Sequence, residues 1–193
     1  MARPREFNET DALSNAMHLF WRRGYEYSSL TDITEATGLS KSSLYGTFGD
    51  KRELLLSSLK FYADNMIAPS LDVLVEETSV LAAIEKRFEM AVGMITAPGP
   101  RCGCLIANTT LEFGGRDKAV AEHLRAAQAL VEDAYARAIE RGQAAGEISP
   151  DADAQVLARY IMACLSGMIC LSKAGFDAPM LRDIAATAMR AIR

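Results

Sequence analysis

Apolar residues recur along this chain every three to four positions, which is the period of an α-helix and not of a β-strand. Glycine and proline fall mainly between these periodic stretches, where helices end. The pattern predicts an all-α fold in which Pro69 breaks the fourth helix. The expected helices cover residues 9–23, 30–37, 41–48, 51–67, 71–76, 80–96, 104–113, 117–145, 152–174 and 179–192.

Three of the short amino-terminal helices are each preceded by a residue that can cap them. Ser29 precedes the second helix and Asp32 follows three positions later, which is the spacing of a capping box. Ser40 and Asp50 precede the third and fourth helices. A tight corner at Gly38 separates the second helix from the third. This is the layout of a helix-turn-helix, whose second helix is built to enter the major groove of DNA.

The segment at 30–53, LTDITEATGLSKSSLYGTFGDKRE, resembles the amino-terminal domain of the TetR family of transcriptional regulators. The resemblance implies a three-helix DNA-binding domain at residues 1–50 and a helical ligand-binding and dimerisation domain at 51–193. It implies a homodimer that binds double-stranded operator DNA and responds to a small-molecule effector. The resemblance continues outside the segment at Ala12-Leu13, Ala16-Met17, Leu19-Phe20, Arg23-Gly24-Tyr25 and Leu54-Leu55.

Hydroxyl side chains and one lysine gather at the first turn of the expected helix 41–48. Free backbone N–H groups there favour a phosphate or a base-edge acceptor, and Lys41 can reach guanine. In the LY-x-x-F pattern of the family, Tyr45 would contact the DNA backbone, and Lys51 matches a phosphate-binding lysine. The candidate DNA-binding residues are Ser29, Thr31, Ser40, Lys41, Ser42, Ser43, Tyr45, Thr47 and Lys51. A basic arm at Ala2–Arg5 either follows the DNA or has no fixed role.

Candidate effector-binding residues lie in the carboxyl-terminal two-thirds of the chain. Apolar side chains would form the walls of a cavity, polar ones would orient the guest, and the nine methionines would make the walls adaptable. Ordinary core packing is the alternative for most of these residues. The candidates are Phe88, Val92, Cys104, Asn108, Glu112, Tyr160 and Met168.

Cys104 supports an alternative function. It opens a helix beside Arg101, and both features stabilise a thiolate. The sequence around it resembles that of TetR regulators that sense oxidants or electrophiles through such a cysteine. The chain is therefore expected to be a repressor released by a small apolar inducer, or alternatively a thiol-based redox or electrophile sensor. A buried packing role for Cys104 stays open as well.

The last two expected helices are predicted to pair with a second copy of the chain. Small residues at 163, 167, 170 and 174 form a stripe on the first of them, which allows another helix to approach closely. The family resemblance places a dimeric four-helix bundle here. A DNA-binding adaptor without any small-molecule ligand is a further interpretation.

Composition narrows the remaining classes. Half of the 193 residues are apolar, enough for a sizeable core, and no run of eighteen uncharged apolar residues predicts a membrane span. Residues 1–62 hold eight Lys/Arg and eight Asp/Glu, so their neutral charge argues neither for nor against DNA. No signal peptide is expected, so the protein should be cytoplasmic with reduced cysteines. No catalytic pattern, metal-ligand spacing or cofactor motif is visible, and the chain is not expected to be an enzyme.

Overall fold

The computed structural model describes residues 8–97 and 99–193, and the regular elements within them are all helices. The predicted all-α fold is thereby confirmed, while the basic arm at Ala2–Arg5 lies outside the described residues. The amino-terminal helices are α1 (Glu9–Arg23), α2 (Leu30–Thr37), α3 (Lys41–Phe48) and α4 (Lys51–Tyr62). The π-helical segment η1 (Ala63–Ile67) and the single turn α5 (Ala68–Ser70) follow. The remaining helices are α6 (Val73–Glu76), α7 (Val80–Thr96), α8 (Leu105–Phe113), α9 (Lys118–Ala144), α10 (Ala154–Lys173) and α11 (Ala178–Ala191).

The expected break at Pro69 was wrong. Helical backbone runs from α4 through η1 into α5, and Pro69 lies in the first turn of α5. Proline is tolerated in the first turn of a helical segment because the N–H that it lacks would have no acceptor within that segment. The helix changes locally just before Pro69, where η1 has the wider π-helical hydrogen-bond register in place of the α-helical one.

The predicted amino-terminal caps are confirmed. The Ser29 hydroxyl accepts the Asp32 N–H at 3.1 Å, and the Asp32 carboxylate accepts the Ser29 N–H at 2.9 Å, which completes a capping box. Ser40 and Asp50 cap α3 and α4 in the same way. Such caps matter for helices this short, because a large share of their backbone N–H groups lack a partner inside the helix.

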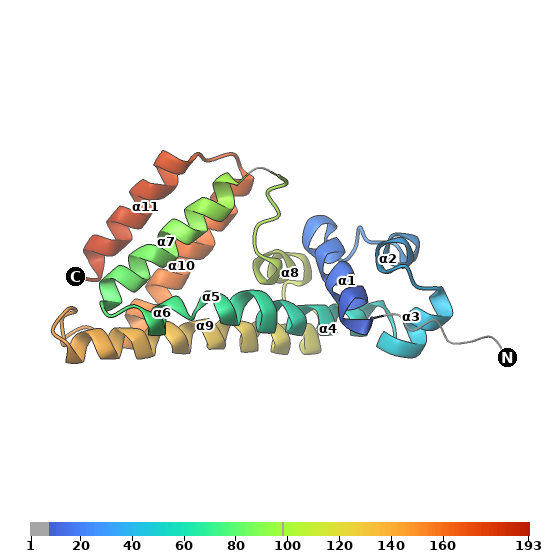
Figure 1. Cartoon of the computed structure of the whole chain (residues 1–193), viewed down its shortest axis with the longest axis horizontal. Coiled ribbons are helices and arrows are strands. Elements are labelled where there is room, and N and C mark those ends of the chain that lie inside the picture. Colours follow the sequence, from blue (N-terminus) through green and yellow to red (C-terminus); the bar gives the residue numbers. More distant parts are fainter. Residues whose placement is uncertain (1–7, 98) are drawn as a thin grey trace.

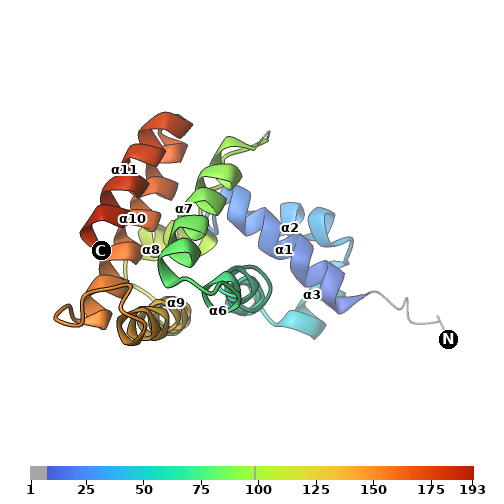
Figure 2. The ribbon, with the colours of Figure 1, turned by 60° about the vertical axis from the view of Figure 1, so that its left-hand side comes forward.

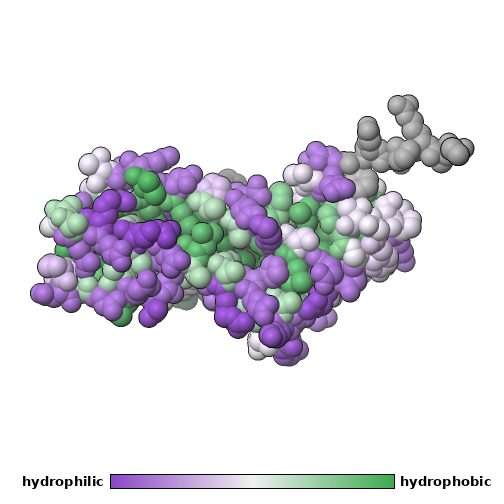
Figure 3. All heavy atoms as spheres, turned by 90° about the horizontal axis from the view of Figure 1, so that it is seen from below, coloured by the Kyte–Doolittle hydropathy of each residue, from purple (hydrophilic) through white to green (hydrophobic). Residues whose placement is uncertain are grey.

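The helices form an elongated molecule (Figure 1). Helix α9 runs along the base beside α4, with α1, α2 and α3 at one end and α7, α10 and α11 at the other (Figures 1 and 2). Helix α8 lies between these two groups. Apolar surface is visible from below in the hollow between the two halves (Figure 3).

Two hydrophobic cores lie along this length, and they share helices. The amino-terminal core contains side chains of α1 to α4 together with Leu105 and Ile106 of α8 and Val120 and Leu124 of α9. The other core joins α6, α7, α10 and α11 to the second half of α9. The DNA-reading helices are thus packed on the helices that follow them, and the division at residue 50 stays a prediction.

Helix α10 leaves much of its apolar surface uncovered. By length and composition alone it could cross a membrane, and only 22% of its most apolar 18-residue stretch is buried. One side of α10 packs on α7, α9 and α11. Val156 and Tyr160 of α10 and Met180 of α11 are exposed. Part of the apolar surface of α10 and α11 is therefore exposed in the single chain.

An ion pair joins the start of α4 to the start of α9. Arg52 binds the Asp117 carboxylate through two nitrogens, at 2.5 and 2.9 Å. Asp117 also caps α9 by accepting the Val120 N–H at 3.1 Å. The hydrogen bond from Arg52, followed by that from Val120, lowers the pKa of Asp117 to about 2.

Replacing Asp117 should therefore give a stability loss that depends on pH. A carboxylate with a lowered folded-state pKa stabilises the fold above its ordinary pKa of about 4, and this stabilisation fades as the pH falls toward 2. We expect Asp117→Asn to lower the thermal midpoint most at pH 7, with the difference from the parent narrowing between pH 5 and 3. Asp133→Asn, an exposed change on the same helix, is the matched control. A deficit that stays constant over this range would contradict the assignment.

Candidate DNA-binding surface and effector cavity

Helix α3 presents a polar face to solvent. Leu44 is its buried anchor, at 2% exposure, whereas Tyr45 is 47% exposed. Lys41, Ser42 and Ser43 are exposed at the first turn. Helices α2 and α3 lie at the end of the molecule remote from α10 and α11 (Figure 1). The helix that a helix-turn-helix inserts into DNA is thus free to approach a duplex.

The structure spreads the nine DNA-binding candidates over three helices and their caps. Five of them, Ser40 to Ser43 and Tyr45, are exposed on α3 or at its cap, and Thr47 is half-buried. Ser29 and Thr31 lie at the start of α2, where the Ser29 hydroxyl is already engaged with Asp32 at 2.6 Å. Lys51 opens α4, and its ammonium lies 4.2 Å from the centre of the Tyr25 ring.

A partly open cavity of about 210 Å³ lies between the DNA-binding helices and the carboxyl-terminal helices. Its walls are mainly apolar, with α1, α4, η1, α5, α7, α8, α9 and α10 all contributing. The aromatic and methionine side chains among its lining residues are Trp21, Tyr62, Met66, Met90, Met94 and Met162. Polar groups come from Ser70, Arg87, Cys104, Gln128 and Ser166. Because Trp21 belongs to α1 and Tyr62 to α4, a molecule in this cavity would touch the DNA-binding half directly.

Of the seven effector-binding candidates, Cys104 alone lines this cavity. Phe88, Val92 and Met168 are packed in the carboxyl-terminal core, at 1% exposure or less. Tyr160, at 38% exposure, lies on the uncovered face of α10 instead. The candidates lie on α7, α8 and α10, which border the cavity, but the sequence indicated neither the contribution of α1 and α4 nor which face of each helix turns toward the cavity.

The other two candidates are engaged in structural contacts. The Asn108 amide donates to the Cys102 carbonyl at 2.7 Å and accepts from the Lys173 ammonium at 3.1 Å. Glu112 accepts two backbone N–H groups from the loop after α1. Among the cavity-lining residues that the sequence analysis missed, the three on α7 share a signal. Arg87, Met90 and Met94 are spaced by three and four positions, and so they fall on one face of that helix.

The segment before α8 connects the cavity to α1. The Trp21 indole N–H donates to the Gly103 carbonyl at 2.9 Å, and its ring meets Tyr62 edge-on at 5.0 Å. Gly103 has φ +74°, a left-handed backbone conformation that favours glycine, and a Cβ there would lie 2.9 Å from the Lys173 side chain. Burial, followed by the neighbouring Cys104 thiol, raises the pKa of Tyr62, which stays neutral at physiological pH.

The carboxyl-terminal end of α8 is hydrogen-bonded to the loop that precedes the helix-turn-helix. The Glu112 carboxylate accepts the Tyr25 N–H at 2.9 Å and the Glu26 N–H at 2.7 Å. The rings of Tyr25 and Phe113 are 5.2 Å apart beside these bonds. Helix α8 therefore reaches from the cavity, at Ile106, to the loop between α1 and α2.

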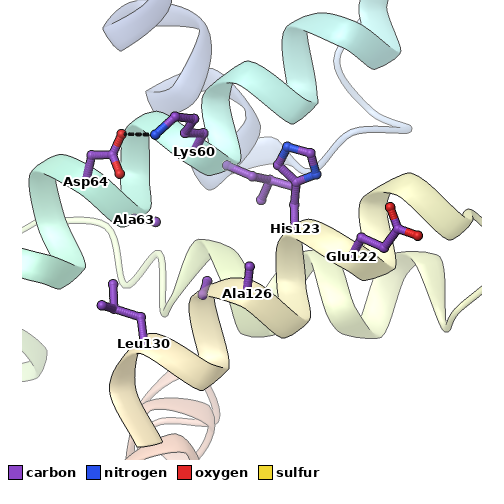
Figure 4. Close-up of a pocket in the computed structure, with 9 residues that line it drawn as sticks. Lys60, Ala63, Asp64, Glu122, His123, Ala126 and Leu130 are labelled. Carbon is purple, nitrogen blue, oxygen red and sulfur yellow. Dashed lines mark hydrogen bonds and ion pairs between the residues drawn. The ribbon is translucent and has the colours of Figure 1, made fainter. Parts of the chain in front are cut away.

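A second hollow of about 440 Å³ lies between α4, η1 and α9. Figure 4 shows the ion pair of Lys60 and Asp64, 2.6 Å apart, on one side, and His123 and Glu122 of α9 on the other. The floor is made of small and branched apolar side chains such as Leu130. Over residues 8–97 and 99–193, no three His, Cys, Asp or Glu side chains lie together as a metal site would need.

A helix-turn-helix with a free reading helix, joined to a helical domain that borders a cavity, defines a class of DNA-binding transcriptional regulators. Residues 12–57 match the family described as "Bacterial regulatory proteins, tetR family", and residues 80–189 match "Tetracyclin repressor-like, C-terminal domain". The chain belongs to the TetR family of transcriptional regulators. This family membership confirms both the predicted resemblance and the expectation that the protein is not an enzyme.

Relatives match over nearly the whole chain. The HTH-type transcriptional repressor ComR of Escherichia coli K12 is 32% identical, over 97% of this chain and 90% of its own length. The HTH-type regulator YezE of Bacillus subtilis 168 is 31% identical, over 95% of both chains. A solved structure of the TetR-family regulator CifR, a cysteine variant in complex with a 26-base-pair operator duplex, is 30% identical with a TM-score of 0.89, and the match covers 100% of both chains.

Proposed function

We propose that this protein is a homodimeric repressor that a small molecule releases from a palindromic operator. The observation that carries the proposal is the position of α8, whose first turn borders the cavity and whose last turn holds the loop of the helix-turn-helix. The relatives support it, since ComR is a repressor by name and CifR is seen on operator DNA. Such a regulator acts where the DNA lies, in the bacterial cytoplasm.

The uncovered face of α10 and α11 is where we place the second copy. This face is apolar and includes Val156, Tyr160 and Met180. Pairing through it would bury the surface and leave the α3 helix of each copy free to reach DNA. Two such reading heads recognise half-sites about one helical turn or somewhat further apart.

Release requires that the effector bind the DNA-incompetent state more tightly than the DNA-bound state. A hundredfold preference corresponds to about 2.7 kcal/mol. A guest in the cavity would press on Trp21, Tyr62 and the first turn of α8. Because Glu112 fixes the other end of α8 to the loop after α1, a shift of α8 would tilt the reading head.

Lys41 and Ser42 are assigned to base edges. Selection of bound duplexes from a random pool should return a palindrome for the parent protein. We expect Lys41→Ala and Ser42→Ala to change the selected bases, because a good bidentate contact discriminates by about 1–3 kcal/mol. An unchanged motif for both variants would contradict the base assignment, and a parent motif without two-fold symmetry would contradict the dimer.

Tyr45 and Lys51 are assigned to phosphates. We therefore expect Tyr45→Phe and Lys51→Ala to weaken binding to all duplexes alike. Removing the Lys51 ammonium should also reduce the salt dependence of binding, by about one unit of slope for each phosphate that it neutralises in the parent. Affinities measured at several salt concentrations, on the selected and a scrambled duplex, test this. A change in base preference would show that these side chains read bases instead.

The thiol-based alternative is tested at Cys104, a half-buried residue in the cavity wall. We expect Cys104→Ser to keep the operator affinity of the parent, and we expect peroxide to leave the parent on DNA. Mobility-shift titrations with peroxide and with an electrophile decide between the two functions. Release of the parent protein, but not of Cys104→Ser, would make the protein a thiol sensor.

A further inference from the structure

The cavity contains one charged residue among its lining side chains, Arg87 of α7. Every other wall residue is apolar or neutral, with Met90 and Met94 following Arg87 on the same face of the helix. A cation in a mostly apolar wall costs desolvation energy unless an anion or several acceptors compensate it. What faces Arg87 therefore indicates what the cavity is built to hold.

Arg87 has no carboxylate partner among the described residues. Its Nε donates to the Tyr135 hydroxyl at 3.3 Å, and no other hydrogen bond or ion pair of Arg87 is formed there. Burial raises the pKa of Tyr135, so this phenol stays neutral and supplies no negative charge opposite Arg87. The two terminal nitrogens of the guanidinium remain available, and together they present the fork that binds a carboxylate.

Two of the three neighbouring charges on α7 are paired elsewhere, and the third, Glu85, is exposed and does not line the cavity. Glu89 binds Arg182 at 3.4 Å, and Lys86 binds Glu77 at 2.5 Å. Neither Glu89 nor Lys86 lines the cavity. The field inside it is therefore set by Arg87, although the whole chain carries a net charge of −4.

The volume limits the size of the guest. The cavity, at about 210 Å³, exceeds by about 60 Å³ the roughly 150 Å³ that hold a benzene ring. The excess is about two water volumes, which suits a carboxylate attached to a ring or to a short chain. Methionines at 66, 90, 94 and 162 would adapt to either body.

We propose that the effector is a small organic monocarboxylate, with a compact aromatic or short aliphatic body among the methionines and its carboxylate on the guanidinium of Arg87. This inference rests on the proposed function only in that it calls the bound molecule an effector. The binding chemistry stands on the cavity itself, so the two can be tested separately.

Direct binding can be followed through Trp21, which is the single tryptophan of the chain and lies in the cavity wall. The probes are benzoate and hexanoate, each compared with its neutral amide, benzamide and hexanamide. We expect at least one carboxylate to change the Trp21 emission and to bind about tenfold or more tightly than its amide, the gain typical of a charge-assisted hydrogen bond. Equal or tighter binding of both amides, or no binding of any probe, would overturn the proposal.

Variants of the protein then test whether Arg87 is the group that binds the carboxylate. Arg87→Gln should remove the preference for carboxylate over amide, and Arg87→Lys should keep part of it. The matched control is Arg125→Gln, which removes an exposed arginine of α9 outside the cavity and should keep the whole preference. Circular dichroism checks that each variant is folded. If Arg87→Gln does not fold, the comparison of carboxylate and amide in the parent still decides. A preference retained by folded Arg87→Gln would place the carboxylate elsewhere and overturn the assignment.

A mobility shift on the selected operator separates this inference from the proposed function. Release of DNA by the carboxylate and not by its amide supports both. Tight binding of the carboxylate without release supports the chemistry of the cavity and contradicts the released-repressor proposal. Release by the amides alone supports the released repressor and overturns the monocarboxylate.

Discussion

The two hydrogen bonds that Glu112 accepts from Tyr25 and Glu26 are the constraint on which the arrangement of the two halves depends. Helix α1 ends at Gly24, whose φ of +83° turns the chain so that the next two N–H groups point at one carboxylate. A charged acceptor strengthens both bonds. A side chain on residue 24 would crowd this carboxylate, because a Cβ there would lie 3.2 Å from its oxygens. The helix-turn-helix thus takes its position from α8.

Further contacts make this position dependent on the whole molecule. Trp21, in the last turn of α1, holds the same end of this helix to Gly103, at the cavity, and Arg52 ties α4 to the cap of α9. The amino-terminal core itself includes side chains of α8 and α9. A small displacement at the cavity therefore has few ways to be absorbed locally, because close-packed interiors transmit strain. In the repressor that we propose, this packing is what joins the effector to the DNA.

Most of the fold could be predicted from the sequence because helix ends are encoded locally. Ser29, Ser40 and Asp50 each act on an N–H group three residues away, so their effect does not depend on the tertiary fold. The effector cavity could not be predicted in this way. Packing between helices that are far apart in sequence decides which face of α7 turns inward. Phe88 therefore lies in the core, whereas its neighbour Arg87 lines the cavity. Glu112 was taken for a ligand group because its partners lie 86 and 87 residues away along the chain.

In the repressor that we propose, the cavity and the DNA-reading helix are coupled, and Trp21 reports on this coupling without any effector. Coupling between two sites is reciprocal, so binding of DNA must change the cavity if occupation of the cavity changes the binding of DNA. The measurement is the Trp21 emission while the selected operator is added, with a scrambled duplex as the control. The account predicts a change that saturates together with binding of the operator and that Glu112→Gln diminishes. An emission that stays constant while the operator binds fully would contradict it.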